Sequence, residues 1–258
     1  MPDRRAVLRG ALLGGALAAA PWVRRARAEE PAVRLAWFHD FPPYSWAEED
    51  GAIRGLFVDV VEEALGRRMG LRVEHVGLPW ARAQALVRAG EADALCTLPT
   101  AERRTFTIPS AEPVLKAPVR IFAGLRGARL GDLERVARLE DLRGFRIAYY
   151  VGSGWVRENL GNRDLTLVEA PDVAGALKLV ARGRADATVE TAPVLRHRLL
   201  QLGLEGELTE LAPVLDTIPF HLCIAKTSPH LGKLPGFDAA LKAMHRDGTY
   251  AKLTRALG

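Results

Sequence analysis

The chain has 258 residues, of which 48% are hydrophobic and 26% are charged, and its formal net charge is +5. This apolar content is ordinary for a globular protein and ample for a buried core. The first 28 residues contain six Arg and one Asp, a net charge of +5, so residues 29–258 are neutral. The basic charge therefore gives no support for nucleic-acid binding, which needs a basic face on the folded domain.

The first residues have the features of an export signal. Arg4 and Arg5 precede an apolar stretch at 11–22, which is too short to cross about 30 Å of hydrocarbon. An Ala-x-Ala cleavage site ends at Ala28. This resembles a twin-arginine signal, so residues 1–28 are predicted to be a cleaved export signal, with cleavage after Ala28 and a periplasmic protein. The alternative is an uncleaved anchor helix, which Pro21 and the clustered arginines disfavour.

Strands and helices alternate along the rest of the chain. Apolar patterning predicts strands at 33–38, 72–76, 93–98 and 105–109, and helices at 56–69 and 80–89. The pattern then restarts, with strands at 118–123, 146–150, 166–169, 187–189 and 222–225, and helices at 155–160, 173–182, 193–202, 237–246 and 249–257. Such alternation is typical of a mainly parallel sheet with helices on both faces.

The two halves of this pattern are built alike. Residues 85–94 (ALVRAGEADA) echo residues 179–187 (LVARGRADA), each a helix, a glycine and an Asp entering a strand. We therefore predict an α/β fold of two lobes, with a cleft between facing strand ends.

One candidate ligand group stands out within residues 79–110. A Thr-Ala-Glu-Arg turn places Arg103 just beyond the carboxyl end of the strand 93–98, at the edge of an α/β sheet where ligands collect. A guanidinium fixed there is suited to binding a carboxylate through two parallel hydrogen bonds. The alternative is a surface cation that pairs with Glu102.

Several short motifs in order carry a family resemblance. They are Phe41-Pro-Pro-Tyr-Ser45, Phe57-Val-Asp59, Pro79-Trp80, Gly90-Glu-Ala-Asp93, Thr100-Ala-Glu-Arg103, Gly152-Ser153, Gly183-Arg-Ala-Asp186 and Met244 through Tyr250. Together they resemble the type 2 periplasmic solute-binding proteins of family 3, the class that binds polar amino acids.

The resemblance implies how the lobes are divided. Lobe 1 would comprise residues 30–113 plus 220–258, and lobe 2 residues 114–219. Two crossover strands, near 113–116 and 216–220, would join the lobes and allow hinge closure. The strand with Cys223 would lie beside that with Cys96, so a disulfide and two buried free thiols both stay open.

The resemblance also assigns ligand-binding residues. Arg103 matches the arginine that binds the α-carboxylate, and Ser153 and Gly154 match the lobe 2 loop that meets the same group. The match places Phe41, Trp80 and Tyr44 on the aromatic walls of the cleft, although Tyr44 can equally pack beneath a loop.

Two positions depart from the family pattern. Thr191 stands where amino-acid binders usually have the Asp that holds the α-amine. Glu190 is one residue away, and neighbours on a strand point to opposite faces. Leu98 occupies a position where amino-acid binders often have a side-chain hydroxyl, although the Leu98 backbone can still form a hydrogen bond with the ligand. These departures leave the identity of the solute open.

These residues predict a periplasmic binding protein that captures a small polar solute, carrying a carboxylate, for the permease of an ABC importer. We expect a monomer without cofactor, metal or nucleic-acid partner, and not an enzyme. One alternative is an enzyme similar to cyclohexadienyl dehydratase, with His39, Glu190 and Lys116 as candidate acids or bases. Another is a soluble sensor or accessory subunit of a membrane or dehydrogenase system.

Overall fold

The computed structural model describes residues 31–255, so the predicted export signal lies outside the described residues. The strands are β1 (Val33–Phe38), β2 (Asp40–Phe41), β3 (Ser45–Ala47), β4 (Ile53–Arg54), β5 (Val73–Leu78), β6 (Ala94–Thr97), β7 (Thr107–Pro109), β8 (Leu115–Gly124), β9 (Arg146–Tyr150), β10 (Thr166–Ala170), β11 (Ala187–Thr191), β12 (Leu208–Glu210) and β13 (Asp216–Ala225). The helices are α1 (Leu56–Val61), η1 (Glu62–Arg68), α2 (Trp80–Arg88), α3 (Ala101–Arg104), α4 (Leu130–Leu133), η2 (Leu139–Leu142), α5 (Gly154–Leu160), α6 (Val173–Ala181), α7 (Ala192–Leu202), η3 (Leu231–Lys233), α8 (Leu234–Asp247) and α9 (Thr249–Thr254).

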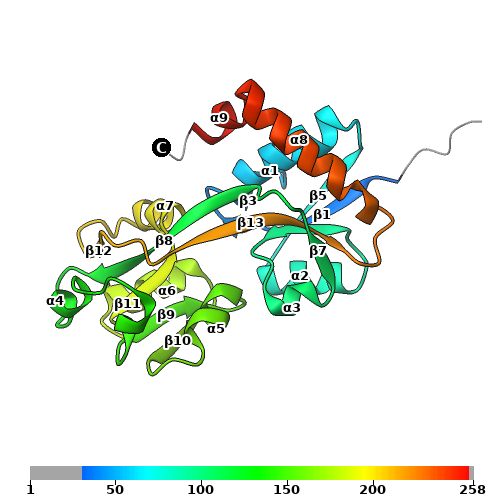
Figure 1. Cartoon of the computed structure of the whole chain (residues 1–258). Helices are drawn as coiled ribbons and strands as arrows, with labels where there is room; N and C mark the ends of the chain where they lie inside the picture. The colour runs from blue at the N-terminus through cyan, green and yellow to red at the C-terminus, as the bar shows by residue number, and fades with distance from the viewer. Residues whose placement is uncertain (1–30, 256–258) are drawn as a thin grey trace, which may run out of the picture. The chain divides into compact units, whose positions relative to one another are not determined.

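Lobe 1 is built on the strand order β13-β6-β1-β5, in which β1 pairs in parallel with both β5 and β6. Helices α1 and α8 cover one face of this sheet and α2 and α3 cover the other (Figure 1). The apolar residues of α2 recur at helical spacing, so that Trp80, Ala83 and Val87 are buried against the sheet.

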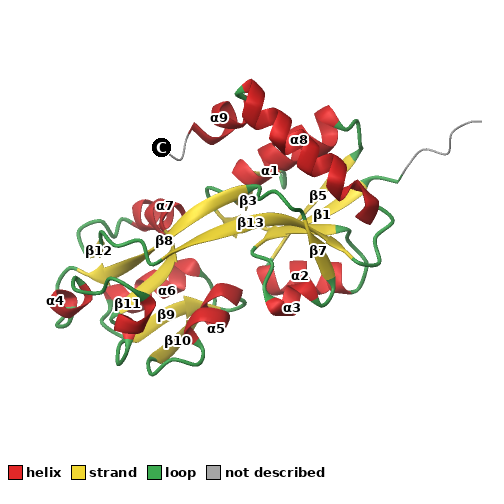
Figure 2. Cartoon of the chain, in the orientation of Figure 1, coloured by secondary structure: helices red, strands yellow, loops and turns green. Residues whose placement is uncertain are grey.

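Lobe 2 is built on the order β10-β9-β11-β8, in which β9 is parallel to β10 and β11, and β8 is antiparallel to β11. The long strands β8 and β13 connect the lobes (Figure 2). These two strands pair with each other in antiparallel register, from Leu115 opposite Phe220 to Val119 opposite Asp216.

The structure confirms the predicted fold class: two lobes, each with a mainly parallel sheet flanked by helices, joined by two crossover strands. The strands predicted at 118–123 and 222–225 begin later than β8 and β13, because Pro118 and Pro219 interrupt their apolar patterns. The crossovers expected near 113–116 and 216–220 overlap the starts of these two strands. Proline is tolerated at positions 118 and 219 because, among the described residues, the strand there has a hydrogen-bonded neighbour on only one side. The residue bounds given above for the lobes stay a prediction.

Other short elements were not predicted. Strands β2, β3 and β4 form a small antiparallel sheet within residues 40–54, and β12 adds to the edge of β8. Elements of two or three residues are too short to show a periodic pattern. The predicted helix at 56–69 consists of α1 followed directly by the π-helical segment η1.

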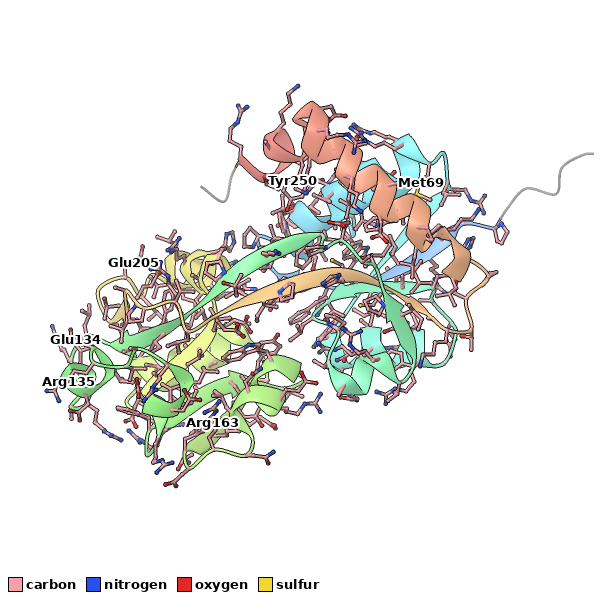
Figure 3. The ribbon with its side chains drawn as sticks, in the orientation of Figure 1. Met69, Glu134, Arg135, Arg163, Glu205 and Tyr250 are labelled. Carbon is pink, nitrogen blue, oxygen red and sulfur yellow. The ribbon has the colours of Figure 1, made fainter. Side chains whose placement is uncertain are left out.

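Charged side chains gather on the outside of the lobes. Glu134, Arg135, Arg163 and Glu205 lie on the outer side of lobe 2, away from lobe 1 (Figure 3). Among residues 31–255, no helix has the length and apolar character needed to span a membrane.

Cys96 and Cys223 are free and buried. Cys96 pairs with Leu222 across the β6–β13 ladder, and Cys223 pairs with Leu95. Directly paired residues share a face of a sheet and successive residues alternate, so the two thiols point to opposite faces. This register explains why neighbouring strands bring the cysteines close without allowing a disulfide.

We therefore predict that both thiols remain free after oxidation. Adding dithiothreitol should leave the thermal unfolding midpoint unchanged, whereas loss of a native disulfide costs about 2–5 kcal/mol. Calorimetry with and without the reductant measures the unfolding midpoint, and thiol titration of the denatured protein counts the free thiols. A midpoint that falls on reduction would contradict the register.

Candidate functional site

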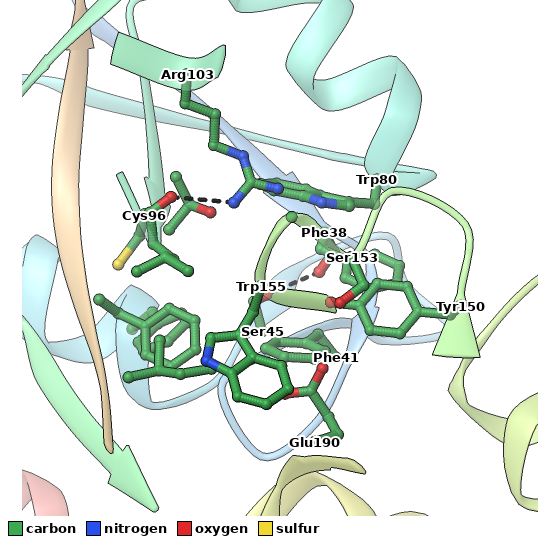
Figure 4. A pocket seen from close by; sticks show the side chains of 16 residues that line it. Phe38, Phe41, Ser45, Trp80, Cys96, Arg103, Tyr150, Ser153, Trp155 and Glu190 are labelled. Carbon is green, nitrogen blue, oxygen red and sulfur yellow. Dashed lines mark hydrogen bonds between the residues drawn. The ribbon is translucent and has the colours of Figure 1, made fainter. Parts of the chain in front are cut away.

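A cavity of about 40 Å³ lies between the lobes, and the crossover strand β13 contributes Ile218 and Phe220 to its lining. Its lining is mostly aromatic or apolar and comprises Phe38, Phe41, Ser45, Phe57, Trp80, Cys96, Thr97, Leu98, Arg103, Tyr150, Ser153, Gly154, Trp155, Glu190, Ile218 and Phe220 (Figure 4). By the same measure a water molecule needs about 10–15 Å³, so the space suits roughly three waters. A solute the size of an amino acid therefore enters when the lobes or the lining side chains move.

Arg103 is fixed in the cavity by the short helix α3. Thr100 caps this helix, because its hydroxyl accepts a hydrogen bond from the Arg103 N–H at 3.2 Å. Thr107 donates its hydroxyl to the Arg103 carbonyl at 2.8 Å. The backbone on both sides of the arginine is thus held, and its side chain is only 3% exposed.

The guanidinium of Arg103 donates to three neutral oxygens. Its Nε donates to Gln84 Oε1 at 3.0 Å, its Nη1 to the Leu98 carbonyl at 3.0 Å, and its Nη2 to the Gly152 carbonyl at 3.2 Å. Among the described residues, no carboxylate lies within ion-pair distance of it. Since arginine carries five N–H donors, donors remain for an anion. Burial lowers the pKa of Arg103, which reflects the cost of an unpaired cation.

The loop before α5 brings lobe 2 against this arginine. The Gly152 carbonyl also accepts a hydrogen bond from Trp80 Nε1 at 3.1 Å. Gly152 has φ +86°, and a Cβ there would lie 2.9 Å from Trp80 Cδ1. A Cβ on Gly154 would lie 2.7 Å from Thr100 Cγ2 and 3.1 Å from both Nη atoms of Arg103. Both positions therefore require glycine for the lobes to meet this closely.

Glu190 brings the opposite charge to the cavity from lobe 2. It is 6% exposed, and its Oε1 accepts a hydrogen bond from the Thr191 N–H at 2.6 Å. Burial raises the pKa of Glu190, while the hydrogen bond from the Thr191 N–H and the nearby Tyr150 hydroxyl oppose this rise. Among the described residues, no cation lies within ion-pair distance of its carboxylate.

Aromatic rings separate and surround the two charges. Trp80 is 5.0 Å from the Arg103 Cζ, a cation–π distance, and Phe38 stacks on Trp80 with ring centroids 5.9 Å apart. Phe38 also stacks on Phe41 at 5.4 Å. Tyr150 and Trp155 complete the lining from the lobe 2 side (Figure 4).

The structure places most of the predicted ligand-binding residues in this lining: Arg103, Ser153, Gly154, Phe41, Trp80, Leu98 and Glu190. Tyr44 lies outside it, fully buried and stacked on Phe57 with ring centroids 4.7 Å apart. Thr191 is also outside it and fully buried. The alternation of the strand thus turns Glu190, not Thr191, to the cavity.

The three candidate acids or bases do not come together. Glu190 lines the cavity, whereas Lys116 is exposed and lines a separate hollow with Glu112 and Tyr250. His39 is half-buried and outside the described cavity lining. Within residues 31–255, no group of three or more His, Cys, Asp or Glu side chains is arranged to hold a metal ion.

Sequence reasoning missed several residues of the site. Gln84, which holds the Arg103 Nε, lies four residues after Trp80 on the same face of α2, so helical spacing was the available signal. Tyr150 ends the strand β9, and Trp155 lies in the first turn of α5. Their positions at the carboxyl end of a strand and at the start of the next helix are typical of ligand sites in α/β sheets.

Polar contacts outside the cavity also join the lobes. Glu102 in lobe 1 binds Arg157 in lobe 2 at 2.8 Å, and Glu158 accepts the N–H of Ala101 at 2.6 Å. Arg198 in α7 binds the carboxylate of Asp40 in lobe 1. These contacts hold the lobes together on more than one side of the cavity.

Comparison with known proteins decides the family. The sequence profile of the bacterial extracellular solute-binding proteins, family 3, matches residues 33–256. The chain belongs to this family. The probable amino-acid-binding protein YxeM of Bacillus subtilis (strain 168) is 26% identical over 221 residues, covering 82% of this chain and 78% of YxeM.

Two solved structures share the fold. A histidine kinase sensor domain with similarity to periplasmic binding proteins has a TM-score of 0.75 at 22% identity, covering 89% of this chain and 97% of that one. An ancestral amino acid-binding protein, a precursor of cyclohexadienyl dehydratase, has a TM-score of 0.67 at 25% identity, covering 87% and 94%. Family membership and these likenesses confirm the predicted two-lobed binding-protein fold.

The close contact at Gly154 gives a testable prediction. Gly154→Ala should hold the lobes further apart, because its Cβ would clash with Thr100 and crowd Arg103. Small-angle X-ray scattering should show a larger radius of gyration than for the unchanged protein. Gly131→Ala is the control, since nothing lies within 4 Å of a Cβ at that position. Equal scattering from the Gly154 variant and this control would contradict the contact.

Proposed function

We propose that this protein captures an amino acid or a closely related zwitterion between its lobes. The observation that carries the proposal is a buried cation and a buried carboxylate, Arg103 and Glu190, that face one cavity without an ion-pair partner among the described residues. A buried unpaired charge is costly, and a solute with both charges would compensate the two at once.

Arg103 is the proposed partner of the solute's carboxylate. Its guanidinium offers further donors, and such pairs are often bidentate. Ser153 and Gly154 lie at the start of α5 beside it, so backbone N–H groups there support the same anion. Glu190 is the proposed partner of the solute's ammonium group. Thr191 is unsuited to this role, because the Thr191 side chain lies outside the cavity lining.

We further propose that the bound solute is delivered to the permease of an ABC importer by a monomeric, periplasmic protein. Membership of an extracellular family supports export, and the Arg4-Arg5 pair with the site ending at Ala28 supports a twin-arginine signal cleaved there. N-terminal sequencing of the exported protein checks the cleavage site, and a mature protein that begins elsewhere would contradict it.

Binding is favoured over catalysis because Glu190 is the one candidate acid or base, of the three predicted, that reaches the cavity. An enzyme similar to cyclohexadienyl dehydratase would need a proton donor and acceptor placed at one solute. A turnover assay with prephenate tests this alternative, and a robust rate would favour catalysis over binding alone.

Replacing Arg103 tests the carboxylate partner. Arg103→Ala should weaken binding of the tightest amino acid in a titration-calorimetry panel by about 100-fold or more, since hydrogen bonds to charged groups are worth about 1.5–3 kcal/mol each. The matched control is Arg104→Ala, because Arg104 is the exposed neighbour in the same helix. Unchanged affinity in the Arg103 variant would contradict the proposal.

Glu190 gives a prediction that links stability to pH. Because its folded pKa is raised, folding favours the protonated acid, and the free energy of unfolding falls as pH rises from the usual Glu range through the folded pKa. Glu190→Gln mimics the neutral acid, so it should raise the unfolding midpoint at pH 7 and lose this advantage in acid. Calorimetric melts over this pH range check it.

The same variant should weaken amino-acid binding by about 10- to 100-fold, because the ammonium loses its charged partner. Glu205→Gln is the control for both measurements, since Glu205 is exposed on the outer side of lobe 2. A Glu190 variant that is less stable at pH 7 and binds as before would contradict both assignments.

A further inference from the structure

We propose that the solute has one carboxylate, one ammonium group and an apolar body, as in an amino acid with an aliphatic or aromatic side chain. Acidic and basic amino acids, which carry a third charge, are then poor ligands. This inference rests on the proposed function, because it assigns Arg103 and Glu190 to the two charged groups of the solute.

The charge content of the cavity limits the solute's charge. Arg103 and Glu190 are the charged residues in the described lining, one of each sign. Once each binds its group of the solute, a second carboxylate or a side-chain cation has no charged partner. Enclosing such a charge without a partner is strongly unfavourable.

Several neutral polar groups of the lining are already used within the protein. Ser45 donates its hydroxyl to the Phe38 carbonyl at 2.8 Å, and Ser153 caps α5. The Tyr150 hydroxyl is close enough to the Glu190 carboxylate to lower the pKa of that group. Thr97 directly precedes Leu98, whose carbonyl binds Arg103, and so belongs to the carboxylate end of the cavity. An amide or hydroxyl on the solute's side chain would lose its bonds to water with few replacements.

The remaining lining presents hydrocarbon. Trp155 is 5% exposed, and its Nε1 donates to Asp216 Oδ2 at 2.6 Å, so the rest of the indole faces the site as an apolar surface (Figure 4). Phe220 packs on Phe57 with ring centroids 4.9 Å apart. Ile218 and Cys96 extend this wall from the two neighbouring strands β13 and β6. We name Trp155, Phe220, Phe57, Ile218 and Cys96 the apolar wall.

Titration calorimetry with the purified protein tests the inference. The probes are leucine, valine, phenylalanine, glutamine, glutamate, lysine and arginine. The tightest apolar amino acid should bind at least about 100-fold more tightly than the charged ones and about 10-fold more tightly than glutamine. Tightest binding of glutamate, lysine or arginine would overturn the inference and leave the proposed function standing. Failure of every amino acid would overturn both.

A pair of cysteine variants tests the apolar wall itself. Cys96→Ser adds a hydroxyl of similar size to the wall and should narrow the preference for leucine over glutamine severalfold. Cys223→Ser is the matched control, since Cys223 points to the opposite face of the same sheet. Circular dichroism confirms folding of both. An unchanged preference in folded Cys96→Ser would contradict contact between the solute's side chain and this wall.

Discussion

The site depends on one buried cation, the guanidinium of Arg103, which has no carboxylate within ion-pair distance among the described residues. Such a group is tolerated because Gln84, Leu98 and Gly152 each supply a neutral acceptor. These acceptors bind three of the N–H donors of Arg103 but leave its positive charge uncompensated. Hydrogen-bonded dipoles replace only part of the hydration that the guanidinium loses on burial. This uncompensated charge is the basis of the anion binding proposed for Arg103.

The same arginine links the site to lobe closure. One of its three acceptors, the Gly152 carbonyl, belongs to lobe 2, and Trp80 shares that acceptor. Glycine at positions 152 and 154 allows this contact, because neither position has room for a Cβ atom. In the proposed function, binding of a carboxylate and approach of the lobes would involve the same atoms, which would give a ligand a physical reason to favour the closed arrangement.

Sequence patterns predicted the elements that contain long periodic stretches and the position of Arg103 after the strand β6. The family resemblance, rather than these patterns, predicted Trp80 and the loop around Ser153 as parts of the site. The patterns could not show that Glu190 rather than Thr191 reaches the cavity, since that depends on the twist and register of β11 beside β8. Trp155 and Phe220 escaped notice because tertiary packing, not local pattern, brings them to the cavity.

The most direct test is a crystal structure of the protein with a bound amino acid. The account predicts that the ligand's carboxylate accepts hydrogen bonds from Arg103 and that its ammonium donates to Glu190. Its side chain should pack against Trp155 and the rest of the apolar wall. A carboxylate bound away from Arg103, with that guanidinium still unpaired, would contradict the central claim.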